Sequence, residues 1–562
     1  MSRRRVVVVA MVLSLAAVGC GGGGGNNGGG GAIKEGGTLR IGTSSGISSL
    51  NPFVGFNQDD YSVWMYIYPS LVQYETRTND LAPYFATDWA RSKDGLTLTF
   101  HTVSGATWSD GESLTAEDAV WTINMILKYA NVAHAPTGAW AGSVAFLESA
   151  SAPDENTVVA KYSRPASTAL TGVGFIPILP PQVWQRYATG DGTAIKTFAN
   201  EPTGGKPLVC GGPFTLTEYK KNNIALFEKN PNYFGPKPHI DGFGLETFDN
   251  EDAMITALKT DQIDAINEIP PTSVETLRSA GLNVFEGPAL ALRDFIINSN
   301  PKKPEHRELL DPQVKEAFEY AVDRNEIVQT AWLGHATPGA ALLPEGDMSE
   351  GVDWHDPNIQ PLPFDIAKAN EILDSLGYQR GPDGIRVAEG HPMAYDVIFP
   401  NDESGAGDRA FQIIQNGFKQ IGVKLTQKKM DNNAAWFAIG APDWKYLDFD
   451  LAMWDWFPAL DPDFLLAAML CNQYGSWNDT GYCNPAYDDL YAEQQLAIDP
   501  QERQKIIYEM QEMVYNDRPY IILTYDKRLD AWNSKTWGGF MESSQGFFNA
   551  FSTESLTSVH QL

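Results

Sequence analysis

The first 31 residues decide where this chain folds. Arg3, Arg4 and Arg5 precede an apolar run over residues 6–18, and small residues then lead to Cys20. The run has 13 residues, whereas a helix needs ~20 apolar residues to cross a bilayer, so the segment is typical of an export signal. We therefore expect residues 1–20 to direct the chain out of the cytoplasm and to take no part in the folded body.

The residues around Cys20 are typical of a lipoprotein signal. Ala17, Val18 and Gly19 precede the cysteine, although a lipobox usually has Leu at the position of Ala17. Two acyl chains anchor a protein stably, because each buried CH₂ contributes about 0.8 kcal/mol. The alternative is an ordinary cysteine beside a cleavage site. Residues 21–35 follow as a Gly-rich tether, so we expect an extracytoplasmic body held to the cell membrane by lipid, in the periplasm where the cell has an outer membrane.

Chain length and charge limit the possible architectures and partners. About 530 residues remain after the signal. A single hydrophobic core usually supports fewer residues than this, so two or three domains are expected. No later stretch has 18 consecutive apolar residues. The net charge of −29 argues against nucleic acid or an anionic membrane surface as a partner, because both attract basic proteins.

The remaining cysteines indicate one disulfide and no metal centre. Cys471 and Cys483 flank the polar loop 472–482, which a disulfide can close in an oxidising compartment; the alternative is two free thiols. Cys210 is better explained as a buried small hydrophobe than as a reactive thiol. Zinc-type spacings are absent from the sequence, and residues 353–356 (Asp-Trp-His-Asp) are better explained as a polar loop. We therefore expect no metal site and no cofactor.

Helix and strand signals alternate along the chain, which predicts a mixed α/β fold in more than one lobe. Leu96, Leu98 and Phe100 alternate with polar residues as in a strand. Thr115 with Asp118 predicts a capping box at a helix start. Comparable signals predict a hairpin over residues 214–228, helices that begin after Asp311 and Asp499, and helices that end at Gly377 and Gly422.

A series of short motifs, each weak alone, occurs in one order between residues 38 and about 545. Trp108-Ser109-Asp110-Gly111 and Lys229-Asn230-Pro231-Asn232-Tyr233-Phe234-Gly235 are two of them. The others lie at residues 50–53, 81–89, 93–100, 114–120, 211–214, 261–265, 321–324, 418–423 and 461–463. In this order they resemble the extracellular solute-binding proteins of peptide/nickel-type ABC transporters, the oligopeptide- and dipeptide-binding family.

The resemblance implies a two-lobed α/β fold of the periplasmic-binding-protein type, cluster C, with an inserted subdomain and a hinge. Lobe I would combine residues 36–75, 203–292 and 515–562, with 76–202 as the insert, and residues 293–514 would form lobe II. It also implies a binding protein rather than an enzyme. Such a protein works as a monomer, closes on an organic solute and delivers it to the permease and ATPase of an importer. A peptide is the first hypothesis for this solute.

Aromatic residues mark the candidate binding surface. Five of the 15 tryptophans fall within residues 436–477, and Trp454-Asp455-Trp456-Phe457 is the densest patch. Large aromatic side chains line many pockets for organic ligands, although they also fill cores. Strand alternation would place the two tryptophans on one face and Asp455 with Phe457 on the other.

The resemblance places that patch in the cleft just before Asp461. It also brings the loop after Phe53 and the strand that ends at Asn298 to the cleft. The same family includes oligosaccharide binders, which is the second hypothesis for the ligand.

A serine hydrolase is the alternative from another functional class. Gly42-Thr43-Ser44-Ser45-Gly46 fits the G-x-S-x-G pattern after an expected strand. A nucleophile elbow requires a helix directly after the turn, whereas the serines and Pro52 that follow favour a loop. We therefore favour solute binding without chemistry.

The lipoprotein assignment is tested by the variant Cys20→Ser. It is expected to leave the membrane fraction, because one residue carries every acyl chain of the anchor. The measurement is immunoblotting of membrane and soluble fractions, with Cys210→Ser as the matched control that stays on the membrane. A processed Cys20→Ser protein that remains wholly membrane-bound would contradict the assignment.

Overall fold

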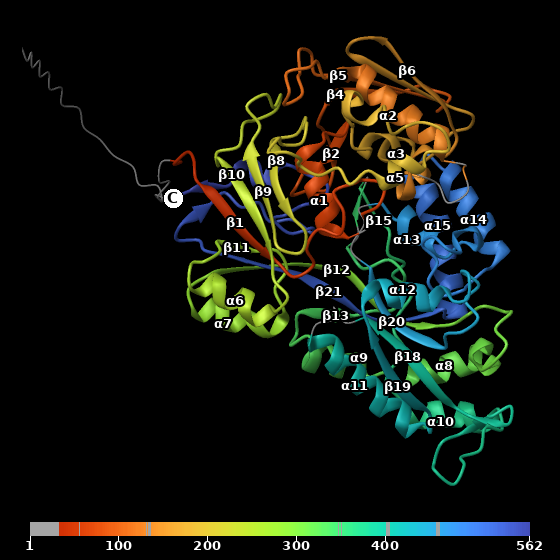
Figure 1. Cartoon of the computed structure of the whole chain (residues 1–562). Coiled ribbons are helices and arrows are strands. Elements are labelled where there is room, and N and C mark those ends of the chain that lie inside the picture. Colours follow the sequence, from red (N-terminus) through yellow and green to blue (C-terminus); the bar gives the residue numbers. More distant parts are fainter. Residues whose placement is uncertain are drawn as a thin grey trace, which may run out of the picture.

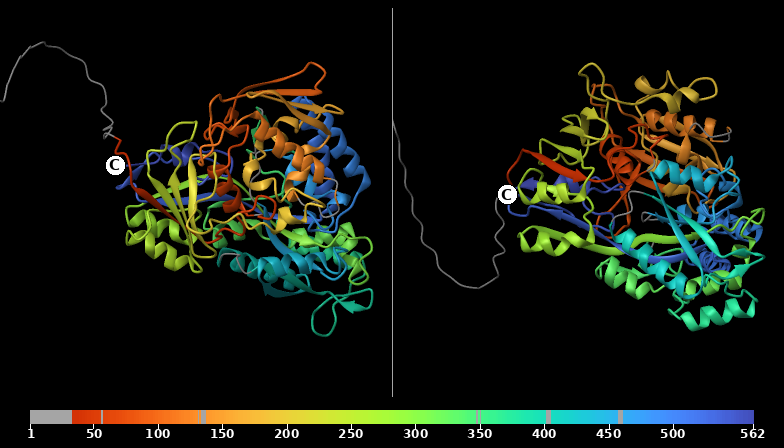
Figure 2. Two further views of the ribbon diagram at one scale, coloured as in Figure 1. Left: turned by 45° about the horizontal axis from the view of Figure 1, so that its top comes forward. Right: turned by 60° about the horizontal axis from the view of Figure 1, so that its bottom comes forward.

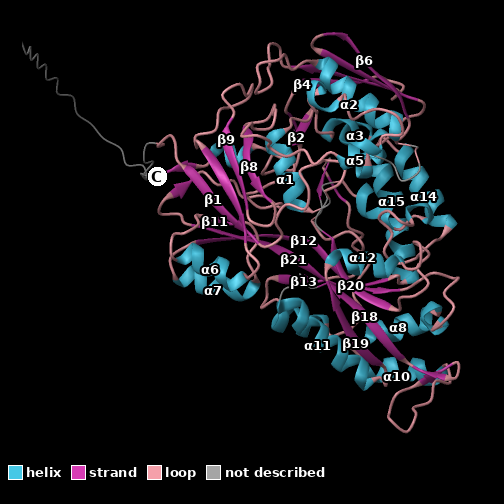
Figure 3. Ribbon diagram, viewed as in Figure 1, coloured by secondary structure: helices cyan, strands magenta, loops and turns pink. Residues whose placement is uncertain are grey.

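The computed structural model of the chain describes residues 33–562 except 56, 131, 133–136, 347, 350, 401–404 and 457–460. The signal segment, Cys20, residues 21–32 of the tether and Phe457 therefore lie outside the described residues. Within the described part, helices and strands alternate as predicted (Figures 1 and 3). None of the described helices has both the length and the apolar composition needed to cross a bilayer.

One mixed sheet runs through most of the body. Its strand order is β19-β18-β20-β12-β21-β11-β1-β10-β9-β8, and β13 pairs with β21 beside this path. The strands are β1 (Thr38–Thr43), β8 (Phe214–Lys220), β9 (Ile224–Lys229), β10 (Gly242–Thr247), β11 (Ala265–Ile266), β12 (Asn283–Ile297), β13 (Ala336–Pro338), β18 (Ala394–Pro400), β19 (Lys424–Met430), β20 (Leu451–Trp456) and β21 (Tyr520–Trp532). The predicted hairpin over residues 214–228 is confirmed as β8 and β9.

Two long antiparallel strands join the two ends of this sheet. β12 has 15 residues and β21 has 13, against about 5–6 in an average strand. Trp532 of β21 pairs with Ala265 of β11 at one end, and Leu292 of β12 pairs with Trp456 of β20 towards the other. Figures 1 and 2 show the pair passing from the part that holds β1 and β10 to the part that holds β18 and β19.

A separate antiparallel sheet of order β4-β5-β7-β6 lies at the upper right of Figure 1, above α1. Leu98 and Phe100 of β5 are buried, as their alternation predicted. Thr115 and Asp118 form the predicted capping box at the start of α2 (Ala116–Tyr129), which packs against β6 and β7. The strands are β4 (Ala86–Arg91), β5 (Thr97–Thr102), β6 (Leu147–Asp154) and β7 (Thr157–Tyr162).

The predicted helix ends in the other part of the body are confirmed. Asp311 caps α8 (Pro312–Tyr320), and Asp499 caps α15 (Pro500–Asp517). Gly377 follows α10 (Ile366–Ser375), and Gly422 follows α11 (Gly405–Gln420); both adopt the positive φ angles that glycine tolerates at a helix end.

The remaining helices and short strands connect these layers. The helices are α1 (Gln58–Ile67), η1 (Gly138–Val144), α3 (Ala169–Phe175), α4 (Pro181–Trp184), α5 (Thr193–Thr197), α6 (Glu251–Lys259), η2 (Pro271–Ser273), α7 (Val274–Ser279), η3 (Arg307–Leu310), α9 (Arg324–Glu326), η4 (Ile327–Ala331), α12 (Asn432–Gly440), α13 (Asp463–Ala468), η5 (Cys471–Gln473), α14 (Pro485–Leu496) and α16 (Glu554–Ser558). The short strands are β2 (Val72–Tyr74), β3 (Leu81–Pro83), β14 (Met348–Ser349), β15 (Val352–Asp353), β16 (Val387–Ala388), β17 (His391–Pro392), β22 (Trp537–Gly538) and β23 (His560–Gln561).

Each end of the large sheet has its own hydrophobic core. The clusters at one end draw their buried residues from the ranges 39–277 and 529–559. The clusters at the other end draw theirs from residues 292–525. The buried apolar contacts of each end are thus made within that end, and β12 and β21 pass from one end to the other.

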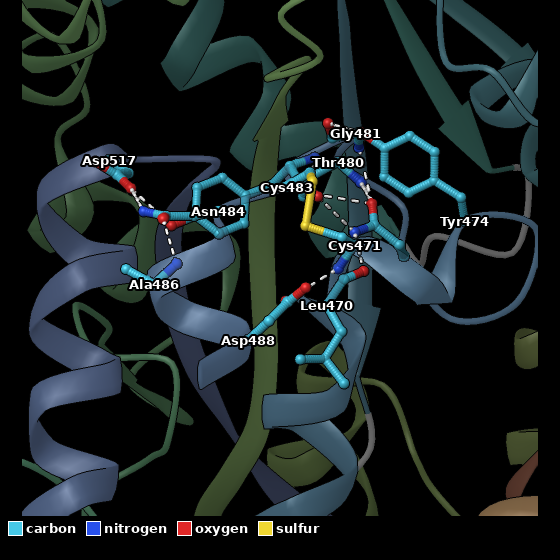
Figure 4. Close-up of a disulfide and its surroundings, with 12 residues drawn as sticks. Leu470, Cys471, Tyr474, Thr480, Gly481, Cys483, Asn484, Ala486, Asp488 and Asp517 are labelled. Carbon is cyan, nitrogen blue, oxygen red and sulfur yellow. Dashed lines mark hydrogen bonds between the residues drawn. A yellow bond between two sulfur atoms is a disulfide. The ribbon is translucent and has the colours of Figure 1, made fainter. Parts of the chain in front are cut away.

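Cys471 and Cys483 are joined by a disulfide, with their Cα atoms 4.4 Å apart (Figure 4). The loop they enclose is held from inside by Asn478, whose Nδ2 donates to the Tyr482 carbonyl at 2.9 Å and whose Oδ1 accepts from Gly481 N at 2.9 Å. Cys210 is buried elsewhere, and desolvation raises the pKa of its thiol to about 12. The thiol is therefore protonated and shielded from solvent at neutral pH.

Alkylation of the exported protein should separate these cysteines in three steps. Native protein is expected to take up no label at Cys210, Cys471 or Cys483, and unfolded protein should take it up at Cys210 alone. Reduction should then expose the other two and lower the free energy of unfolding by about 3 kcal/mol on the chain-entropy model. Peptide mapping of each sample provides the measurement; labelling of Cys471 and Cys483 without reductant would show that the bridge does not form.

Candidate functional site

A cavity of about 2120 Å³ lies where β12, β20 and β21 meet the segments around α1 and η1. Pockets for drug-sized ligands usually measure about 300–1,000 Å³. Its walls come from both ends of the large sheet, since residues of α1 face residues of β20, α12 and α13 across it. The space is therefore large enough for an extended organic ligand held between two bodies.

Aromatic side chains form one side of this cavity, which we call the aromatic wall: Trp436, Trp454, Trp456, Phe464 and Trp477. The ring centroid of Trp454 lies 5.8 Å from that of Trp436. The ring of Trp456 lies 5.7 Å from Phe464 and 6.4 Å from Trp477. Trp456 is only 5% exposed, so it joins the wall to the core beneath, whereas Trp454 is half-buried.

The predicted alternation along β20 is confirmed. Trp454 and Trp456 pack in the same hydrophobic cluster as Leu292 of β12, whereas Met453 belongs to the cluster on the opposite face of the sheet. Asp455 pairs with Arg293 across the two strands. Trp454, Asp455 and Trp456 nevertheless all line the cavity. The strand ends there, so the cavity adjoins both faces.

Arg293 connects two carboxylates that line the cavity. Its Nη2 lies 3.4 Å from Asp455 Oδ2, and its Nε donates to Asp526 Oδ2 at 3.0 Å. Burial raises the pKa of Asp526, and the Arg293 charge opposes that rise. Asp455 remains 59% exposed. Its carboxylate is therefore accessible to a ligand but already faces a cation.

Arg528 is the centre of a second paired group. Its Nε donates to Asp530 Oδ1 at 2.8 Å, and its Nη1 lies 3.4 Å from Glu268 Oε2. Beneath it, burial raises the pKa of Asp59 to about 7, although Thr43 and Arg528 oppose the rise. The cavity thus presents side chains of both signs. The sequence analysis missed Arg293 and Arg528, because Arg293 meets Asp526 and Arg528 meets Glu268 only through the fold.

Asp461 lines the cavity, but its carboxylate is engaged. Arg503 donates to its two oxygens at 3.0 and 2.8 Å, and Arg503 is 1% exposed. Burial alone would raise the pKa of Asp461, yet the guanidinium lowers it. This two-bond pair fixes the start of α13 to α15, so the direct contribution of Asp461 to a ligand is limited.

Two residues that the sequence analysis placed at the cleft do not line this cavity. Phe53 is buried and packs edge-on against Trp184, with ring centroids 5.6 Å apart. Asn298 is fully buried, and its Nδ2 donates to the carbonyls of Tyr446 and Phe449 at 3.0 and 2.7 Å. Phe53 therefore belongs to a hydrophobic core, and Asn298 holds backbone carbonyls of residues 446 and 449. Phe457 lies outside the described residues.

Ser44 lines the cavity without the surroundings of a nucleophile. β1 ends at Thr43, and the first described helix after it begins at Gln58, so the turn is followed by a loop as expected. None of the histidines in the described part of the chain lines the cavity. A nucleophile elbow needs both the strand–turn–helix geometry and a base within reach, and Ser44 has neither arrangement here.

Comparisons with known proteins agree with this geometry. Residues 80–477 match the family described as bacterial extracellular solute-binding proteins, family 5 Middle. The chain is 28% identical over 511 residues to Protein XP55 of Streptomyces lividans, covering 88% of this chain and 85% of that protein. It is 23% identical over 482 residues to the dipeptide-binding protein of Escherichia coli strain K12, covering 82% and 83%. Its structure is similar to that of the oligopeptide-binding protein AppA from Bacillus subtilis in complex with a nonapeptide, with a TM-score of 0.79, 18% identity, and coverage of 94% and 100%.

Proposed function

The chain belongs to family 5 of the bacterial extracellular solute-binding proteins, and we propose that it captures an oligopeptide for an ABC importer. It shares the two-lobed fold of periplasmic binding proteins with AppA. Proteins of this family bind solutes and are not enzymes, so the ligand is expected to leave unchanged. The observation that carries the proposal is the cavity of about 2120 Å³ between the two ends of the sheet, with its aromatic wall and paired charges.

The binding mechanism we propose is closure of two lobes about β12 and β21. Lobe I comprises residues 36–75, 203–292 and 515–562 with the insert 76–202, and lobe II comprises residues 293–514. The separate cores at the two ends of the sheet support a division into two bodies, but residues 520–525 of β21 pack in the cores of lobe II, so the chain crosses into lobe I within β21 rather than at residue 515. Closure expels water from the cavity and strengthens the polar contacts within it, as in hinge-bending binding proteins.

An oligopeptide is favoured by the size and chemistry of the cavity. Its volume exceeds that of drug-sized pockets about twofold. Arg293, Arg528 and Lys527 line it together with Asp455 and Glu268, so a ligand with charges of both signs can be matched. Of the proteins named above, the one from Escherichia coli is named a dipeptide-binding protein, and AppA was solved in complex with a nonapeptide. An oligosaccharide is the second candidate, because the aromatic wall can also contact sugar rings.

We also propose that Cys20 carries a lipid anchor and that residues 21–35 are the tether. The described chain begins at Ile33, and β1, which starts at Thr38, lies at one end of the body (Figure 1). A tether attached at that end would hold the body at the membrane and leave the cavity accessible to solutes. The protein, closed around its solute, would then deliver it to the permease and ATPase of the importer.

The peptide proposal is tested first by mass spectrometry of material released from freshly purified protein. The identified ligand is then titrated against the variant Trp454→Ala/Trp456→Phe while tryptophan fluorescence is recorded. Most of the ligand-dependent change should disappear. Binding should weaken roughly 30-fold, since truncation of an aromatic anchor typically costs about 2 kcal/mol.

Two control variants separate this result from a general defect. Trp89→Phe removes a half-buried tryptophan from β4, outside the cavity, and should retain the fluorescence change. Ser44→Ala should retain full binding. Steady conversion of the ligand to a product, lost in Ser44→Ala, would replace the binding function with hydrolysis, and a released sugar would select the oligosaccharide.

A further test concerns the free amine of the peptide. Several peptide-binding relatives hold it with an Asp just before the Asp-Pro pair, where this chain has Pro458 and Ala459. Asp455 is the nearest exposed carboxylate on β20, and Arg293 already faces it. An amine anchor would have to displace that guanidinium. We therefore expect a peptide and its N-acetylated form to bind within about tenfold of each other, that is within 1.4 kcal/mol.

Isothermal titration calorimetry of the two peptides measures this difference directly. The variant Asp455→Asn is the matched control and should change both affinities equally. A hundredfold loss on acetylation that Asp455→Asn abolishes would show that Asp455 anchors the amine after all.

A further inference from the structure

A second cluster of chemically reactive side chains lies in lobe II, outside the cavity. It combines His306, Glu308 and His391, whose ligand atoms all lie within 4.8 Å of one another. His306 precedes η3, which holds Glu308, and His391 lies in β17. None of the three lines the cavity. The solute-binding function therefore does not account for this cluster.

The donor atoms lie near enough to one another for one small cation to contact all three residues. His306 Nδ1 lies 3.3 Å from Glu308 Oε1, and His391 Nε2 lies 3.6 Å from Glu308 Oε2. Zinc bonds of about 2.0–2.1 Å in tetrahedral geometry separate neighbouring ligand atoms by roughly 3.3–3.4 Å. Two imidazoles and one carboxylate are a familiar ligand set for zinc.

The hydrogen bonding of the cluster is incomplete without a cation. The Glu308 side chain is fully buried, yet its Oε2 has no hydrogen-bond partner among the described residues. A buried carboxylate oxygen normally gains a hydrogen bond or a metal, so this oxygen points to a missing ligand.

A neighbouring hydroxyl orients the carboxylate. Tyr395 of β18 donates to Glu308 Oε1 at 2.7 Å and is itself buried. Metal-binding carboxylates and imidazoles are commonly held by such outer hydrogen bonds, which fix their orientation. The imidazoles remain partly exposed at 21% for His306 and 35% for His391, so a water molecule can reach the fourth coordination position.

We propose that His306, Glu308 and His391 bind one zinc ion, with water as the fourth ligand. The ion ties the loop before α8 to the short hairpin of β16 and β17, two segments that are distant in the sequence. It braces lobe II without contact to the solute. The sequence analysis expected no metal because these residues follow none of the familiar short spacings.

The proposal is tested with tag-free protein that has been stripped with EDTA and titrated with zinc chloride against a chromophoric chelator. One equivalent should bind, and zinc should raise the melting temperature. The variant His306→Ala/His391→Ala should lose both effects. Tyr395→Phe should weaken zinc binding by about 10–100-fold, as loss of an outer hydrogen bond typically does.

The control variant is His101→Ala, which removes an exposed imidazole beside Asp88 and should retain zinc binding. Glu308→Gln keeps the shape of the side chain, so it decides the outcome if the double variant does not fold; it should lose zinc. Equal zinc binding by wild type and Glu308→Gln, or no binding by wild type, would overturn the proposal. Cobalt substitution with the visible spectrum of a tetrahedral site would support it.

Discussion

The hydrogen bonds between β12 and β21 connect two hydrophobic cores that otherwise draw on different parts of the chain. The pair begins at Asn283 and Trp532 and extends to Ile296 and Tyr520, with irregular register between Glu286 and Asp294. Such irregularities interrupt a ladder and increase its local twist and bend. The paired strands are therefore continuous between the two ends of the sheet, but their ladder is irregular where β12 lines the cavity. A hinge between two lobes would lie at this level.

The same two strands supply the cavity with its charges. Arg293 and Asp526 face each other across the pair, and Arg528 contacts Asp530 and Glu268. A buried guanidinium without a partner would carry a large desolvation penalty, and these two are paired before any ligand arrives. A ligand can then exchange partners with exposed members such as Asp455. The affinity for a ligand can thus depend on the exposed Asp455 while the buried pair of Arg293 and Asp526 stays intact.

Local chemistry explains what the sequence could predict. Thr115 and Asp311 could be predicted as helix caps because the capping bonds are made within three residues. The disulfide could be predicted because Cys471 and Cys483 are separated by a single short loop. Asn298 belongs to an expected cleft segment, but whether an amide contacts ligand or backbone depends on a loop about 150 residues away, which no local pattern records.

The tryptophans of residues 436–477 combine features that the local sequence predicts with features that depend on the tertiary structure. Their density correctly indicated an aromatic surface, and alternation correctly separated Trp454 and Trp456 from Asp455. That Trp454, Asp455 and Trp456 all line the cavity depends on how β20 sits in the folded molecule, which is a property of the tertiary structure. The zinc proposal has the same origin, since His391 reaches Glu308 only through the packing of lobe II.

The position of β21 also constrains the order of assembly. β21 lies between β12 and β11, so its 13 residues complete the central ladder of both lobes. It comes from the last tenth of the chain, and neither lobe can close its sheet until residue 532 has left the ribosome. Contacts of such high sequence separation form slowly. The central sheet of such a chain is therefore completed only at the end of synthesis, after the separate β4-β5-β7-β6 sheet already has all of its strands.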